Sequence, residues 1–177
     1  MFNEIHKKEL FDACDEFGNK LGIDMVRGEP HKEGLYHEVV EILTVNLHNQ
    51  ILVTKRAESK NYPLYWEITG GSVLKGETTL EGAKRELFEE TGLNAENLTL
   101  LYRKTEKDAL FRGFVTQVSS DKVILQLGET IDHQWIDACD FVEFINKELF
   151  IPTTRKRLLC AWYLIEPMLF KNEQYDC

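Results

Sequence analysis

Glutamates gather in one short stretch of the chain. The segment from Gly71 to Leu93, GSVLKGETTLEGAKRELFEETGL, contains five glutamates. Three of them, Glu86, Glu89 and Glu90, are three and four residues apart, so they share one side of an α-helix. Like charges at these spacings cost about 0.2–0.5 kcal/mol per pair, and the last two also oppose the helix dipole. A solvated acidic surface is one interpretation, and a hard divalent cation bound through carboxylate oxygens is the other.

The residues around these glutamates predict where the helix begins and ends. Thr78 followed by Glu81 three residues later is typical of a capping box, and Gly92 suits the left-handed conformation that often ends a helix. We therefore expect a helix from Thr79 to Thr91. Its buried face should carry the apolar residues at spacings of three and four, which are Leu80, Ala83 and Leu87.

The rest of the chain reads as strands before and after this helix, with two more helices at the end. Gly18 and Asn19 suit the turn of an N-terminal β-hairpin. Further strands are expected in residues 36–54 (two strands joined near LHNQ), YWEITGG, LTLLYRKTEK, LFRGFVTQV and KVILQL, and helices in DFVEFI and TTRKRLLCAWYLIEPMLF, the last with a stripe of Leu158, Ala161, Ile165 and Leu169. This order predicts an α/β fold with a mixed sheet covered on both faces. We expect one domain over residues 1–177, with a lead-in at 1–35 and the core at 36–170.

The composition limits the classes of molecule that we expect the protein to bind. The chain has 177 residues, 43% of them hydrophobic, and a formal net charge of −9. This charge argues against a nucleic-acid-binding surface, and an anionic substrate would need a cation to bridge it to the protein. No apolar run is long enough to span a membrane and no secretory signal is recognisable, so we expect a cytoplasmic protein. The scattered cysteines support neither a zinc site nor a disulfide framework.

The spacing of the fixed residues resembles the Nudix box. Gly71, Glu77, the Arg85–Glu86 pair, the Glu89–Glu90 pair and Gly92 reproduce every fixed position of that motif. The resemblance to the Nudix hydrolase family implies an α/β/α sandwich that binds Mg²⁺ or Mn²⁺ and hydrolyses a diphosphate linked to another moiety. We expect a small-molecule substrate, namely a nucleoside diphosphate derivative.

The same resemblance implies roles for individual residues. Glu86, Glu89, Glu90 and the backbone carbonyl of Gly71 would hold the metal. Arg85 would orient a carboxylate, with Glu77 as its partner. The catalytic base differs among Nudix subfamilies, and both Glu86 and the later Glu129 are candidates here.

Three basic residues are candidates for binding the substrate phosphates. Lys75 lies in the loop before the helix, and Lys55 and Arg56 end a predicted strand, where neighbouring side chains face opposite sides. A plain solvated charge is the alternative for each of them. Four aromatic residues are candidates for stacking on a nucleobase, although aromatic side chains in strands more often lie in the core: Tyr62, Trp66, Phe111 and Trp135.

Outside the box, the chain also resembles the Nudix branch that includes isopentenyl diphosphate isomerase. YHEVVEILTVN, with His37 and Asn46, and ETIDHQW carry this resemblance. The isomerase needs a cysteine and a histidine around the first box glycine, where this chain has Gly70, Gly71 and Ser72. We therefore favour the hydrolase and interpret His37 as an ordinary strand histidine rather than a metal ligand. A nucleotide sensor without turnover is a third hypothesis, and a homodimer is compatible with the sequence.

Overall fold

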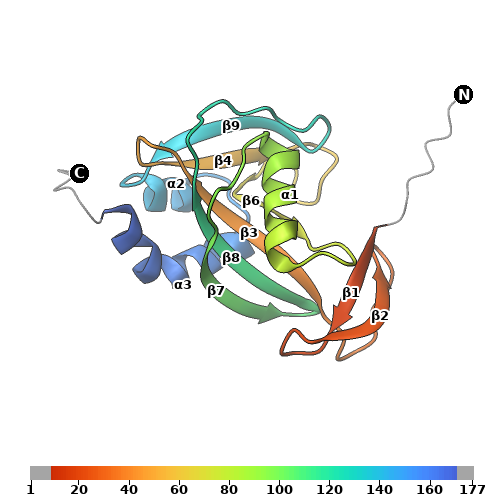
Figure 1. Ribbon diagram of the computed structural model, residues 1–177. Coiled ribbons are helices and arrows are strands. Elements are labelled where there is room, and N and C mark those ends of the chain that lie inside the picture. The colour runs from red at the N-terminus through yellow and green to blue at the C-terminus, as the bar shows by residue number, and fades with distance from the viewer. Residues whose placement is uncertain (1–8, 171–177) are drawn as a thin grey trace, which may run out of the picture.

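The computed structural model describes residues 9–170, and its elements follow the predicted order closely (Figure 1). The strands before the acidic helix are β1 (Leu10–Cys14), β2 (Lys20–Val26), β3 (His37–Val45), β4 (Gln50–Arg56), β5 (Trp66–Glu67) and β6 (Thr69–Ser72). The acidic helix is α1 (Thr79–Thr91). It is followed by β7 (Thr99–Glu106), β8 (Ala109–Gln117), β9 (Thr130–Asp137), α2 (Phe141–Lys147) and α3 (Pro152–Leu169). No helix within residues 9–170 is long and apolar enough to cross a membrane.

Seven strands form one mixed sheet around β3. Its main order is β5-β4-β3-β8-β7, while β6 pairs with β3 and β9 pairs with β4. The β3–β8 pair is parallel and the other pairs are antiparallel. The predicted mixed sheet is therefore confirmed, and β3 lies at its centre, next to the segment that precedes the acidic helix.

Helices cover both faces of this sheet, as predicted (Figure 1). On one face, Val40 and Ile42 of β3 pack with Ala83 of α1. On the other face, residues from β3 and β4 pack with α2 and α3 in the largest apolar cluster, which includes Leu43, Val45, Phe141, Ile145, Leu158, Ala161 and Ile165. Because successive strand residues point to opposite faces, the apolar run of β3 serves both layers.

The N-terminal hairpin is also confirmed. Strands β1 and β2 pair antiparallel, and Gly18 in their connection has a φ of 91°, a conformation that favours glycine. The hairpin joins the rest of the molecule through apolar contacts of Phe11, Ala13 and Met25 with Leu35 and Leu74. It therefore packs against the loop that leads into α1.

The caps of α1 form as the sequence predicts. The hydroxyl of Thr78 accepts a hydrogen bond from the Glu81 amide at 3.2 Å, and the Glu81 carboxylate accepts one from the Thr78 amide at 2.8 Å. Gly92 ends the helix with a φ of 70°. The predicted buried face is wrong at one end, because Leu80 is 49% exposed. Leu80 lies in the first turn, and the buried face runs from Ala83 and Leu87 to Glu90.

Removing the N-cap should weaken the fold measurably. We expect Thr78→Ala to lower the free energy of unfolding by about 1 kcal/mol, because the Glu81 amide loses its acceptor at the start of α1. Urea denaturation at neutral pH measures this difference. Thr78→Ser, which keeps the hydroxyl, is the matched control and should stay close to the wild type. Equal stability of the Ala and Ser variants would show that the cap contributes nothing.

One predicted strand is wrong. Residues 122–127 (KVILQL) form no strand, and the next strand is β9, which contains the DHQWID segment and pairs with β4. Their backbone instead covers the end of α1. The amide of Ile124 donates to the carbonyl of Thr91 at 2.8 Å, and the amide of Gln126 donates to that of Glu90 at 3.2 Å. Their hydrogen bonds thus go to the helix end, and not to a neighbouring strand.

Candidate active site

The loop before α1 is placed by strand pairing. β6 lies antiparallel to β3, with Gly71 opposite Val40 and Ser72 opposite Val39. This pairing brings Gly71 against the side chain of Glu86, since a Cβ at position 71 would lie 2.2 Å from the Glu86 carboxyl carbon. Any side chain at position 71 would displace that carboxylate from its present position, which accounts for a glycine here.

Arg85 gathers the carboxylates of the loop and the helix. Its guanidinium donates to both carboxylate oxygens of Glu77 at 2.6 and 3.0 Å. The same group donates to Glu86 at 2.9 Å, to Glu89 at 3.0 Å and to the backbone carbonyl of Ser72 at 2.9 Å. Charge-assisted and bidentate hydrogen bonds of this kind fix side-chain orientation. Arg85 thus ties the loop to the helix, as expected for an orienting residue, while its catalytic role stays a prediction.

Glu90 is the most deeply buried carboxylate of the helix. Its side chain lies on the packed face of α1, and only 5% of the residue is exposed. One of its oxygens, Oε2, is shielded from solvent and has no hydrogen-bond partner among the described residues. Burial, together with the charges of Glu67 and Glu86, raises the pKa of Glu90 to about 8. A carboxylate in such surroundings is costly unless a positive charge joins it.

Glu86 and Glu67 lie close enough to Glu90 for their charges to raise its pKa. Burial raises the pKa of Glu86, and the adjacent Arg85 opposes this shift. Burial also raises the pKa of Glu67, which pairs with Arg56 at 2.6 Å. Three acidic groups therefore share a poorly solvated region beside Gly71, which is a donor set that fits a hard divalent cation.

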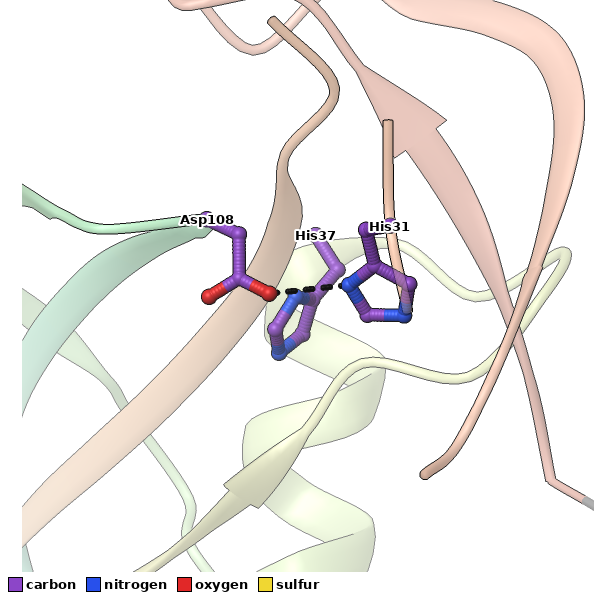
Figure 2. Close-up of side chains that lie close together, drawn as sticks. All are labelled: His31, His37 and Asp108. Carbon is purple, nitrogen blue, oxygen red and sulfur yellow. Dashed lines mark hydrogen bonds and ion pairs between the residues drawn. The ribbon is translucent and has the colours of Figure 1, made fainter. Parts of the chain in front are cut away.

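The surroundings of Glu86, Glu89 and Glu90 differ. Glu86 and Glu90 are largely buried, whereas the side chain of Glu89 is 46% exposed and turns toward Arg85. The ligand atoms of these three glutamates do not all lie within 4.8 Å of one another. The one group of three metal-ligating side chains within residues 9–170 that meets this distance lies elsewhere in the fold and consists of His31, His37 and Asp108 (Figure 2). The structure therefore brings Glu86 and Glu90 to the loop of Gly71, while Glu89 lies at the edge and is held by Arg85.

The second candidate base, Glu129, lies in the connection before β9. Its carboxylate forms an ion pair with Lys60. Burial lowers the pKa of Lys60, and the negative charge of Glu90 opposes this shift, so Lys60 is near both glutamates. The structure thus brings Glu129 to the same region as Glu90 through a lysine that the sequence analysis did not single out.

The three predicted phosphate-binding residues have different surroundings. Lys75 turns toward the hairpin and pairs with Asp24 at 2.6 Å. Arg56 pairs with Glu67 and also donates to the backbone carbonyl of Asn61 at 2.7 Å. The ammonium group of Lys55 lies 5.2 Å from the centre of the Trp66 ring. Arg56 therefore lies beside the buried acidic groups, Lys75 reaches the hairpin, and phosphate binding by any of the three stays a prediction.

The four aromatic candidates for nucleobase stacking also differ in their burial and contacts. Trp66 is 5% exposed and belongs to the main core, which favours the structural interpretation. Trp135 packs partly buried against the cluster that contains Leu87, and the guanidinium of Arg157 lies 3.7 Å from the centre of the Phe111 ring. Tyr62 is 47% exposed and packs edge-on against Tyr65. Of the four side chains, that of Tyr62 is the most exposed.

The sequence patterns did not identify two residues of this region, Glu67 and Lys60. Glu67 lies in YWEITGG, where a charged residue inside an apolar strand was a usable signal. Glu67 pairs with Arg56 because of the strand register. Thr54, two residues before Arg56, lies directly opposite Glu67 in the β4–β5 pair. Lys60 gave no comparable signal, because its contact with Glu129 joins segments 69 residues apart.

The space beside Gly71 yields a direct prediction. If Glu86 serves in catalysis, we expect Gly71→Ala to lower kcat by about 10²-fold, because the new methyl group displaces the Glu86 carboxylate and misplacement by about 1 Å can cost this much. Steady-state kinetics of Gly71→Ala, Glu86→Gln and the double variant measure the effect. If the methyl group acts through Glu86, the two losses will not add. Full additivity, or an unimpaired Gly71→Ala enzyme, would contradict this explanation.

The fold and the site together define a class of protein: an α/β/α sandwich in which a loop and a capped helix gather carboxylates beside a glycine. The model of the NUDIX domain matches residues 35–156, and the chain belongs to this family.

Individual proteins show the same relationship. "Nudix hydrolase 3" of Arabidopsis thaliana is 35% identical over 111 residues, which are 61% of this chain and 13% of that protein. An isopentenyl-diphosphate Delta-isomerase of Pectobacterium atrosepticum is 31% identical over 103 residues, which are 57% of this chain and 56% of that protein. The chain spans only 13–53% of the length of the first three curated relatives that it matches.

A solved structure supports the fold. DR0079 from Deinococcus radiodurans superimposes with a TM-score of 0.72 at 20% sequence identity, covering 87% of this chain and 99% of that one. At this level of identity the similarity concerns the fold, and the α/β/α sandwich predicted from the sequence is confirmed.

Proposed function

We propose that this protein is a metal-dependent hydrolase that cleaves a diphosphate linkage in a small molecule, specifically a nucleoside diphosphate derivative. The observation that carries this proposal is the buried Glu90 carboxylate, whose Oε2 has no partner among residues 9–170 and whose pKa is raised to about 8. A buried acidic group with one unpartnered oxygen, next to Glu86 and Glu67, destabilises the fold, so its presence favours a function that needs it.

Mg²⁺ or Mn²⁺ would be held by Glu86, Glu89, Glu90 and the backbone carbonyl of Gly71. When bound, such a cation neutralises charge that develops on the phosphate oxygens and lowers the pKa of a coordinated water. Arg85 keeps Glu86 and Glu89 in place through its hydrogen bonds at 2.9 and 3.0 Å. Glu86 and Glu90 already lie beside the loop of Gly71, whereas Glu89 would have to turn from Arg85 to reach the cation.

A base must take the proton of the attacking water, and Glu86 is our first choice. In the metal-free protein, burial raises the pKa of Glu86, and a carboxylate with a raised pKa is the better base. Glu129 is the second choice, because its ion pair with Lys60 must open before its carboxylate can accept a proton. Arg56, which pairs with Glu67, is proposed to contact the phosphates. Lys55 lies over Trp66 of the main core, on the opposite face of β4, and Lys75 can contact the phosphates only after leaving Asp24.

Two other functions are weighed against the hydrolase. The isomerase alternative is supported by the 31% identity to the Pectobacterium enzyme, but the Gly70, Gly71 and Ser72 segment supplies no thiol for a proton shuttle. The sensor alternative would need no catalytic carboxylates, whereas this chain retains all of those of the box.

Phosphate release from a substrate panel tests the proposal. The panel contains nucleoside diphosphate sugars, dinucleotides, nucleoside triphosphates and isopentenyl diphosphate, each with and without Mg²⁺, and a coupled phosphatase where the product requires it. We expect metal-dependent release from one group of nucleotide derivatives. Conversion of isopentenyl diphosphate to its isomer, followed by NMR, would replace the hydrolase with the isomerase. Tight nucleotide binding without turnover would replace it with the sensor.

A further inference from the structure

A cavity lies between β7 and α3, away from the acidic helix. β7 is an edge strand of the main sheet, and α3 contacts it (Figure 1). The cavity has a volume of about 330 Å³, which is within the range of small-molecule sites. Leu101 of β7 and Ala161 of α3 line it, and both belong to the main apolar cluster. The cavity therefore opens on the face of the sheet that α2 and α3 cover, opposite to α1.

Hydrogen bonds fix the polar side chains that line this cavity. Tyr102 of β7 lies opposite Gly113 of β8, where a Cβ atom would lie 2.2 Å from the tyrosine ring. The glycine thus leaves space for the ring, whose hydroxyl donates to Glu41 at 2.7 Å. Arg157 of α3 donates to Glu41 and to Glu106, both at 2.7 Å. Because both walls are held by charge-assisted hydrogen bonds, the cavity is built into the fold.

The charged residues around the cavity are mostly basic. Four of the five that line it are lysine or arginine, in a chain whose formal net charge is −9. Arg157 is already paired, but Lys104 and Lys156 form no ion pair or side-chain hydrogen bond with any residue from 9 to 170. Lys104 shares a face of β7 with Tyr102, and Lys156 lies on α3. One unpaired cation therefore stands on each wall of the cavity.

The helix also leaves apolar side chains in water beside the cavity. Cys160, Tyr163 and Leu164 line it and are three and four residues apart, so they share one side of α3. Tyr163 is 70% exposed and Leu164 is 39% exposed. Exposed apolar side chains that surround a hollow are typical of a binding site. The cavity thus combines an apolar lining with two free positive charges.

We propose that this cavity binds a small phosphate monoester that carries an apolar group. A phosphate monoester has a charge of about −1.5 to −2 at pH 7, which matches the charges of Lys104 and Lys156. Its apolar group would pack against Leu101, Ala161 and Leu164. The ligand is a second molecule, distinct from the diphosphate proposed for the acidic helix, and its binding requires no divalent cation.

Calorimetric titration of the full chain with octyl phosphate, in the presence of a chelator, tests this site without any activity measurement. We expect one equivalent to bind. Octyltrimethylammonium has the same apolar chain with the opposite charge, and inorganic phosphate has the charged group alone. Each should bind at least about 10-fold more weakly than octyl phosphate, because each lacks one of the two sets of contacts. Octanoate, with a single negative charge, should also bind more weakly.

Charge-reversal variants assign the binding to the two lysines. Lys104→Glu and Lys156→Glu should each weaken the binding of octyl phosphate by about 10–100-fold, which is the usual contribution of a hydrogen bond to a charged group. Lys32→Glu is the matched control. It makes the same change of charge at an exposed lysine in the connection between β2 and β3, outside the cavity.

A second pair of variants tests the apolar part of the cavity. Cys160 is exposed on α3 and lines the cavity, so the indole of Cys160→Trp should fill the space and prevent binding. Cys160→Ser leaves the space open and should bind octyl phosphate as the wild type does. Because the position is exposed, both variants should fold normally, and circular dichroism checks this.

Three results would overturn the proposal. The first is no binding of octyl phosphate, or equal affinity for octyltrimethylammonium. The second is unchanged affinity in folded Lys104→Glu and Lys156→Glu. The third is binding that requires Mg²⁺, which would place the ligand at the acidic helix. The titrations contain neither a divalent cation nor a diphosphate, so their outcome is independent of whether the acidic helix catalyses hydrolysis.

Discussion

Glu90→Gln should abolish most of the Mg²⁺-dependent hydrolysis, with kcat/KM falling by about 10³-fold or more. The substitution keeps the shape of the side chain but removes the charge that would hold the cation, and with it the stabilisation of developing negative charge. Steady-state kinetics at saturating Mg²⁺ measure the loss. Glu81→Gln is the matched control, because Glu81 belongs to the same helix but serves the capping box, in which glutamine also works. Unchanged activity of a folded Glu90→Gln enzyme would refute the assignment of Glu90.

The same substitution should stabilise the metal-free protein. The pKa of Glu90 is raised to about 8 from an ordinary value of 4.5. The folded form therefore keeps a proton that the unfolded form loses above about pH 4.5, so the free energy of unfolding falls as the pH rises from 4.5 to 8. Glutamine cannot ionise, and this contribution disappears. We expect Glu90→Gln to match the wild type near pH 4.5 and to exceed it by about 2–4 kcal/mol at pH 8.

Urea denaturation at pH 4.5, 6 and 8 with a chelator present measures this difference, with Glu81→Gln again as the control. Added Mg²⁺ should remove most of the advantage of the variant, because the cation binds the folded wild type. A wild type and a Glu90→Gln variant with parallel pH profiles would show that Glu90 is already ionised in the fold. The raised pKa would then be wrong, and the need for a cation would rest on geometry alone.

Glu86→Gln and Glu129→Gln should separate the two candidate bases. We expect Glu86→Gln to lower kcat by about 10²–10⁴-fold, which is the usual contribution of a general base. Glu129→Gln should cost less than about 10-fold, because Glu129 is paired with Lys60. The pH dependence of kcat gives a second readout, since removal of the base also removes the acidic limb of the profile.

Lys60→Met serves as the companion variant for this comparison. If Glu129 were the base, Lys60→Met would free its carboxylate from the ion pair, and the acidic limb of the variant's pH profile would differ from that of the wild type. Glu129→Gln would then also show the larger loss of kcat. If Glu86 is the base, Lys60→Met leaves the acidic limb in place. A larger loss in Glu129→Gln than in Glu86→Gln would exchange the two assignments.

Local signals explain why so much of the fold was predictable. The caps of α1 depend on Thr78, Glu81 and Gly92, which act within a few residues of one another. The hairpin depends on a glycine with positive φ, and the two-sided burial of β3 follows from its apolar run. The same local reasoning failed for residues 122–127, because their backbone partners are the carbonyls at the end of α1 and no apolar pattern encodes that contact.

The candidate site was predictable only in part. The spacing of the box placed Glu86 and Glu90 on one side of the helix, but it did not reveal that Glu90 lies on the packed face with Ala83 and Leu87. The ion pair of Lys60 with Glu129 joins residues 69 positions apart, and the contact of His31 with Asp108 joins residues 77 positions apart. Such contacts depend on sheet topology, which a single sequence does not specify.

Proton release on Mg²⁺ binding tests the central claim most directly, namely that a divalent cation binds at the buried carboxylates. Because the pKa of Glu90 is raised to about 8, its carboxyl group is mostly protonated at pH 7 and must ionise when the metal binds. Calorimetric titration in two buffers of different ionisation enthalpy counts the protons. We expect release of close to one proton by the wild type and by Glu81→Gln, and weaker binding with almost no release by Glu90→Gln. Mg²⁺ binding of equal affinity and equal proton release in all three proteins would contradict the account.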